Sequence, residues 1–153
     1  EAKKGKLIDN LYSELEHIAF YKLKPPKSLG IEWVKQNLQI ILKKYSNKPV
    51  EDLLCTYTTH SANQIAKNLN NISSVLVTGG GTYNSFLISK IRQMTNCEII
   101  IPSTDIVNYK EAIIFAFLSV LKIRGEVNCF ASVTGSKHDH SSGKIFFPNS
   151  IID

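Results

Sequence analysis

Cysteine is scarce in this chain, and so are long hydrophobic runs. Its three cysteines, Cys55, Cys97 and Cys129, are far apart and show no CxxC spacing, which excludes a disulfide framework and a cysteine-based zinc site. This usage is typical of a reducing compartment, so we expect the cytoplasm. The longest nearly unbroken apolar stretch, Ala112 to Leu121, is about half of what a bilayer span requires, so no membrane association is expected.

The chain also lacks a concentrated block of one charge. Its formal net charge is +5, and its lysines are spread in small groups, without a stripe of arginine interleaved with aromatic residues. This distribution argues against a nucleic-acid partner, whereas a small molecule that carries phosphate fits a modest positive balance. Because 43% of the 153 residues are hydrophobic, the whole length, 1–153, is expected to fold as a single domain.

The N-terminal part of the chain shows helical periodicity. Apolar residues at helical spacing predict a first helix over 6–21, a second helix after residue 28, a third over 49–54 and a fourth through Leu69. Four helices therefore precede the first strand. The expected breakers and caps are Pro25 and Pro26 after the first helix, Ser28 before the second, Pro49 at the third, and Thr58 or Thr59 at the fourth.

Three consecutive glycines, Gly79, Gly80 and Gly81, follow the apolar strand that begins at Ser74. Residues without a Cβ let a turn adopt positive φ and let amide N–H groups approach an anion. A helix over 85–94 and a strand over 97–101 come next, which predicts a βαβ unit with parallel strands. A long apolar helix over 109–123 then ends at Gly125, its Phe115–Leu118 segment being core, and a short strand is expected over 145–147.

Two familiar glycine motifs do not match. A dinucleotide fingerprint needs a third glycine near Asn84, and a P-loop needs a lysine after Gly81. One alternative is that the glycine turn only serves tight packing between strand and helix. The stretch His138-Asp139-His140 could present metal ligands, but its Ser- and Gly-rich surroundings favour a solvated loop, so no metal site is predicted.

Four short segments, read in order, carry a more specific signal. They are Pro-Pro-Lys-Ser-Leu-Gly at 25–30, Val-Thr-Gly-Gly-Gly at 77–81 with Asn84, Tyr-Lys-Glu-Ala at 109–112 with the 115–118 segment, and Ser-Val-Thr-Gly at 132–135. Together they resemble the C-terminal part of anhydro-N-acetylmuramic acid kinase over about 25–148. The resemblance covers nearly the whole chain.

The resemblance implies a kinase of the actin, Hsp70 and sugar-kinase superfamily that uses ATP and Mg²⁺, with two α/β lobes closing over ATP and sugar. Such an enzyme opens the 1,6-anhydro ring of a recycled cell-wall amino sugar by adding water while it phosphorylates the sugar. The expected fold class is therefore α/β. In this C-terminal lobe of an actin-like fold, a helix-rich N-terminal part packs on a small mixed sheet with the βαβ unit.

The resemblance also implies roles for particular residues. Thr78 and the three glycines would hold the phosphates or adenosine of the nucleotide, while Asn84 would stabilise the turn or touch the nucleotide. Glu111 would reach the sugar, although its place near a helix start also suits the helix dipole alone. Lys27 and Ser28 would lie at the cleft, with Ser28 as a plain helix cap being the alternative.

The chain departs from the family pattern in one important respect. It contains neither the phosphate-binding Gly-Thr-Ser and Asp-Gly segment nor the separate aspartate base of the family's N-terminal lobe. No catalytic residue is therefore expected in it, and we expect a lobe that is silent alone, with the N-terminal lobe as its missing partner. An exposed apolar surface where that lobe would pack favours a homodimer. The alternative functions are a stand-alone nucleotide-binding regulatory module and a structural α/β module without a ligand.

Overall fold

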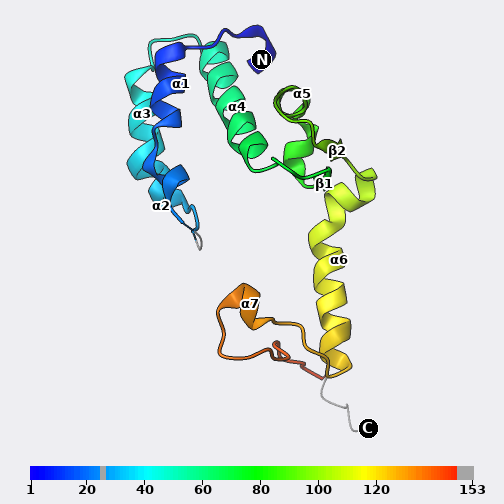
Figure 1. The fold of residues 1–153 in the computed structure, drawn as a ribbon. Coiled ribbons are helices and arrows are strands. Elements are labelled where there is room, and N and C mark those ends of the chain that lie inside the picture. Colours follow the sequence, from blue (N-terminus) through cyan, green and yellow to red (C-terminus); the bar gives the residue numbers. More distant parts are fainter. Residues whose placement is uncertain (25–26, 148–153) are drawn as a thin grey trace, which may run out of the picture. The chain divides into compact units, whose positions relative to one another are not determined.

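The computed structural model of the chain describes residues 1–24 and 27–147. The chain forms two compact units, Glu1–Ser103 and Thr104–Asp153. The elements of each are labelled in Figure 1. Pro25 and Pro26, which the sequence predicts to end the first helix, lie outside the described residues.

The first unit opens with short helical segments. The predicted helix over 6–21 is in fact an α-helix, α1 (Asp9–Glu16), followed by a 3-10 turn, η2 (Ala19–Lys22), and it is preceded by another such turn, η1 (Ala2–Lys4). The second predicted helix consists of α2 (Ile31–Trp33), a π-helical stretch η3 (Val34–Leu38) and α3 (Gln39–Lys44). Gly30 occupies the N-cap position of α2 without a side-chain bond, so the assignment of Ser28 as the cap is wrong.

One long helix replaces the third and fourth predicted helices. α4 runs without interruption from Val50 to Lys67, with Pro49 at its N-cap position. Thr58 and Thr59 lie inside this helix and are buried, so they do not cap it. Cys55, Thr59, Ala62 and Ala66 are all buried, and their spacing places them on one face of the helix. Because this buried face is continuous, the helix does not stop at Thr58 and Thr59 but runs past them.

The N-terminal segment is attached to the first turns of α4. The amide of Lys6 donates to Asp52 Oδ1 at 2.7 Å, and the amide of Ile8 donates to Thr56 Oγ1 at 2.9 Å. A Cβ at Gly5 would collide with the carbonyl group of Glu51. The chain therefore approaches α4 here at a distance that only glycine permits.

Hydrophobic side chains from α1, α2 and α3 form one core of this unit. Leu11, Leu15 and Ile18 are buried, and partly buried residues of the following helices, Trp33 among them, pack against these three. α1 contacts both α3 and α4. Burial of this shared apolar surface stabilises three helical segments that are each too short to be stable alone.

The predicted βαβ unit is present. β1 (Ser74–Leu76) and β2 (Glu98–Ile100) pair in parallel, with Val75 opposite Ile99, and α5 (Ser85–Met94) has the predicted bounds. α5 packs against α4, and a second core lies around Ala62, Ile91 and Ile99. The expectation of a mixed sheet is wrong for the described residues, whose only sheet is this parallel pair.

The second unit consists of a long helix and an irregular segment. α6 (Thr104–Ile123) begins one turn before the predicted start, so Asp105 lies within its first turn. Its end is a Schellman motif, because the amide of Gly125 (φ +71°) bonds Lys122 O at 3.1 Å and that of Glu126 bonds Leu121 O at 2.9 Å. The prediction that Gly125 ends the helix is confirmed.

Two other expectations for this unit are wrong. Phe115 and Phe117 are 67% and 61% exposed rather than core residues, because the four-residue α7 (Ala131–Thr134) and the loops of this unit cover little of α6. The strand predicted over 145–147 does not form, and an isolated antiparallel bridge joins Cys129 to His140 instead. Among the helices that the structure describes, none is both long and apolar enough to cross a membrane.

Candidate nucleotide site at the glycine turn

The glycine turn lies at the carboxyl edge of the parallel strand pair. Beyond β1, the amide of Val77 still donates to Ile100 O at 2.9 Å, so the strand pairing continues to the start of the turn. Thr78 follows and is half-buried. In open α/β sheets this edge is where ligands bind.

Gly79 has a backbone conformation that other residues rarely adopt. Its φ is +83° and its ψ is 172°, a combination that is nearly exclusive to glycine. Among the described residues, no heavy atom lies within 4 Å of the position that a Cβ would occupy there. Backbone conformation, and not crowding, therefore requires glycine at 79.

A short 3-10 turn, η4 (Gly80–Tyr83), follows Gly79 and is held by Thr82. The Thr82 amide and hydroxyl both donate to the carbonyl oxygen of Gly79, at 3.0 Å and 2.8 Å. The Thr82 side chain is buried. Sequence reasoning missed this residue, although a threonine hydroxyl can bond a carbonyl oxygen three residues earlier.

Asn84 caps the helix that follows the turn. Its Oδ1 accepts a hydrogen bond from the amide of Leu87 at 3.1 Å, and its carbonyl oxygen accepts from Ile88 at 3.1 Å. A side chain that satisfies one of the first amides of α5 fixes the angle between turn and helix. The geometry thus gives Asn84 a structural role in the turn, and contact with a nucleotide stays a prediction.

Gly80 and Gly81 differ from Gly79 because the fold does not require them. Neither has a positive φ, and at neither residue would an added Cβ have a heavy atom of the described residues within 4 Å. Within the described part of the chain, their amides have no hydrogen-bond acceptor. Tight packing of strand against helix therefore does not explain these two glycines. Their open faces and free N–H groups suit a ligand that approaches the main chain.

A pocket of about 420 Å³ opens beside the turn, along one face of α5. Thr82 reaches it from the turn, and the helix contributes polar side chains one turn apart, including Ser85, Ser89 and Arg92. The Arg92 guanidinium donates to Ile99 O at 3.3 Å. Sequence reasoning did not select this arginine, although the spacing of 85, 89 and 92 places the three on one helix face.

Three other residues are expected at the cleft, Lys27 and Ser28 in the first unit and Glu111 in the second. Lys27 donates to the carbonyl oxygens of Phe20 and Tyr21 at 3.3 Å and 3.4 Å, and its ammonium lies 5.0 Å from the centre of the Phe20 ring. Ser28 is exposed. Glu111 is exposed on α6 and belongs to the second unit.

The loop that contains His138 and His140 forms local hydrogen bonds. Asp139 Oδ1 accepts from the amide of Ala131 at 2.7 Å at the start of α7. The backbone of His140 bridges to Cys129, and His140 Nδ1 lies 3.1 Å from the carbonyl oxygen of His138. Among the residues that the structure describes, no three His, Cys, Asp or Glu side chains form a group that could hold a metal ion.

A partly buried electrostatic network joins α1 to α4 in the first unit. His60 is 1% exposed, and its Nδ1 lies 2.8 Å from Glu16 Oε1 while its Nε2 lies 3.0 Å from the Tyr21 hydroxyl. A neutral imidazole with its proton on Nδ1 satisfies both contacts. Asn63 and Gln64 also donate to Glu16 Oε1, at 3.1 Å and 2.8 Å, and Lys67 donates to Oε2.

This network, which we call the Glu16 network, changes the pKa values of its members. Burial alone would raise the pKa of Glu16, but hydrogen bonds from Lys67, Gln64, Asn63 and His60 outweigh it and lower the pKa to about 2. Burial lowers the pKa of His60, against the opposing effect of Glu16. The network therefore stabilises the packing of α1 against α4.

These features define a helix-rich α/β protein with a glycine turn at the edge of a parallel strand pair. The sequence profile of the family described as anhydro-N-acetylmuramic acid kinase matches residues 1–148. The chain therefore belongs to the anhydro-N-acetylmuramic acid kinase family.

Curated relatives that bear this name agree. The chain is 31% identical to the protein of Caldanaerobacter subterraneus, with 94% of this chain and 40% of the relative covered. It is 35% identical to the protein of Francisella tularensis subsp. novicida, with 95% and 41% covered. It is 32% identical to a protein of Bacillus cereus, with 96% and 42% covered. The chain spans about 40% of the length of these relatives.

Proposed function

We propose that residues 1–153 are the C-terminal, nucleotide-binding lobe of an ATP-dependent anhydro-N-acetylmuramic acid kinase with an actin-like sugar-kinase fold. The complete enzyme would add water across the 1,6-anhydro ring and phosphorylate the sugar, in cytoplasmic recycling of cell-wall material. Family membership supports the reaction. One structural observation supports the role of this lobe: Gly80 and Gly81 have open faces that the fold itself does not use.

The turn offers the chemistry that a phosphate needs. Free amides at Gly80 and Gly81 would donate to phosphate oxygens, and the positive end of α5, which is 10 residues long, adds to the attraction. Thr82 keeps the turn closed through its two bonds to Gly79 O. We infer that ATP would contact the main chain at these glycines.

Mg²⁺ would be held differently. The residues from Thr78 to Asn84 include hydroxyl and amide side chains but no carboxylate, and Mg²⁺ prefers carboxylates together with phosphate oxygens. In this proposal the ion arrives on the phosphates of ATP, and its carboxylate ligands come from the N-terminal lobe. The chain itself would therefore be catalytically silent alone.

The sugar side of the proposal depends on residues outside the turn. Glu111 would accept hydrogen bonds from sugar hydroxyls or orient the attacking water, which a carboxylate can do. Lys27 and Ser28 would lie along the same cleft. These three assignments rest on the family resemblance of the segments around them.

Titration calorimetry with MgATP tests the nucleotide site. Gly80→Asp puts a negative charge where we place the phosphates, and because nothing lies within 4 Å of its Cβ it should fold normally. Asn96→Asp is the matched control, since it adds the same charge in the exposed loop before β2. We expect binding by the wild type and by Asn96→Asp, and about tenfold or greater loss in Gly80→Asp. Equal affinity in all three proteins would refute the phosphate assignment.

A further inference from the structure

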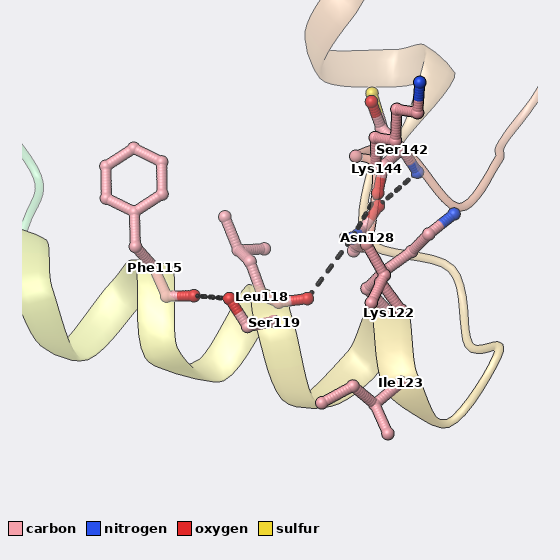
Figure 2. Close-up of a pocket in the computed structure, with 11 residues that line it drawn as sticks. Phe115, Leu118, Ser119, Lys122, Ile123, Asn128, Ser142 and Lys144 are labelled. Carbon is pink, nitrogen blue, oxygen red and sulfur yellow. Dashed lines mark hydrogen bonds between the residues drawn. The ribbon is translucent and has the colours of Figure 1, made fainter. Parts of the chain in front are cut away.

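A second pocket lies wholly within the second unit, on the C-terminal half of α6. It has a volume of about 530 Å³ and is bounded on the other side by residues 128–129 and 142–145 (Figure 2). Apolar side chains form most of its wall, notably Phe115, Leu118, Ile123 and Ile145. The volume falls in the range of sites that bind small organic molecules, which is about 300–1,000 Å³.

The loop that closes this pocket is held in place by Asn128. Its Nδ2 donates to Leu118 O at 3.3 Å and to Ser142 O at 3.2 Å, and its Oδ1 accepts from the amide of Ser142 at 2.7 Å. Gly143 then turns the chain with a φ of +97°. One side chain therefore ties the loop to α6 and keeps the pocket formed without a ligand.

Among the described residues, the charged side chains that line this pocket have one sign. They are Lys122 and Lys144, and no aspartate or glutamate of residues 1–24 and 27–147 belongs to the lining. The Lys122 ammonium donates to Ser141 O at 3.1 Å, and an ammonium has three N–H donors, so two remain for a ligand. Lys144 lies over the exposed ring of Phe146, with 4.9 Å from its Nζ to the ring centre.

We propose that this pocket binds a small amphipathic anion, with its apolar body against Phe115, Leu118 and Ile145 and a carboxylate or phosphate head near the two lysines. Charge complementarity selects an anion, because a neutral ligand would leave both ammonium groups without a counter-charge. The apolar wall selects a hydrocarbon chain or ring over a free inorganic ion. The pocket belongs to the second unit and the glycine turn to the first, and the proposal does not depend on the proposed kinase function.

Calorimetry on the complete chain without nucleotide tests this site, with decanoate, decyl phosphate and decanol as probes. We expect at least one of the two anions to bind and decanol to bind much more weakly. Lys122→Gln combined with Lys144→Gln should weaken anion binding about tenfold, which corresponds to about 1.4 kcal/mol. Lys137→Gln is the matched control, because Lys137 is exposed in the same unit outside the pocket lining.

A third variant separates binding in the pocket from adsorption on exposed apolar side chains. Ser119→Phe should fill the pocket without a change of charge and abolish anion binding. Preference for decanoate or for decyl phosphate tells which head group the site takes. The proposal is overturned if neither anion binds, if decanol binds as well as the anions, or if the double lysine variant binds like Lys137→Gln. Circular dichroism of each variant checks that the helices are intact.

Discussion

Acid should destabilise the first unit through the Glu16 network. The pKa of Glu16 falls from an ordinary 4.5 to about 2 in the folded chain. A carboxyl with a depressed folded pKa contributes stability that is complete above its unfolded pKa and is lost as the pH falls toward the folded value. The stability should therefore decline between about pH 5 and pH 2. The difference in pKa corresponds to about 3 kcal/mol of the free energy of unfolding. This value is an upper limit, because 19% of the Glu16 side chain stays exposed and water screens part of the interaction.

His60 adds to this decline over a different pH range. Burial lowers its pKa below the ordinary 6.5, so the folded chain holds the neutral imidazole while the unfolded chain takes up a proton. Stability is then complete above about pH 6.5 and falls as the solution becomes more acidic. The charged groups nearest to His60 are Glu16 and Lys67, and Tyr12 and Tyr21 pack against its ring.

Urea unfolding at a series of pH values measures both effects, with Trp33 as the probe. It is the only tryptophan and packs against the Leu11 and Leu15 core. Glu16→Gln removes the titrating carboxyl, so its free energy of unfolding should be lower than wild type at pH 7 by up to about 3 kcal/mol and should converge with it near pH 2. Glu1→Gln removes one partner of an exposed ion pair in the same unit as Trp33 and should change little. Parallel pH profiles for wild type and Glu16→Gln would refute the assignment.

Three further predictions use the same urea assay. Gly5→Ala should destabilise the chain by about 1–3 kcal/mol, since the new Cβ would collide with the backbone of Glu51; an unchanged midpoint would contradict this close approach. Gly79→Ala should cost about 1–3 kcal/mol of backbone strain, whereas Gly80→Ala should leave stability equal or raise it by about 0.4–1 kcal/mol; equal losses would show that packing requires both glycines. Asn84→Ala should lower the free energy of unfolding by about 1 kcal/mol. Asn84→Ser should restore most of this loss, because α5 needs a side-chain oxygen that accepts from the amide of Leu87, and a serine hydroxyl can also supply it.

Elements with local signals were predictable from the sequence. α5 has a capping asparagine, an amphipathic face and a strand on either side, and its bounds agree with the prediction. Gly125 ends α6 because a C-terminal glycine in the left-handed conformation satisfies the last carbonyl groups without help from distant residues. Such signals lie within a few residues of the structure that they specify.

Elements that depend on distant contacts were not predictable. Thr58 and Thr59 favour a helix start on local propensity, but burial of their helix face keeps α4 continuous. The prediction that Phe115 is buried was wrong. Helical periodicity shows that one face of a helix is apolar, but it does not show whether another element covers that face. The Glu16 network joins residues 44 positions apart, a separation at which a single sequence carries no pairing signal.

The glycine turn was found from the sequence because three adjacent glycines are rare and lie after a strand. The sequence alone did not distinguish the roles of the three glycines. Only the backbone conformation shows that Gly79 needs a positive φ and that Gly80 and Gly81 do not. Thr82 and Arg92 were missed for a related reason. A hydroxyl that closes a turn and an arginine beside a pocket resemble ordinary surface residues until the fold places them together.

The nucleotide site at the glycine turn is tested most simply by titrating the ¹⁵N-labelled chain with MgATP and following its backbone amide resonances, with MgCl₂ and adenosine as separate controls. We predict the largest shifts at Gly80 and Gly81, smaller ones in the first turn of α5, and loss of this pattern in Gly80→Asp. Adenosine should shift these two amides much less than ATP, because in our proposal the amides of Gly80 and Gly81 contact the phosphates. The claim is contradicted if MgATP shifts resonances elsewhere in the chain while Gly80 and Gly81 stay unchanged, or if it shifts none.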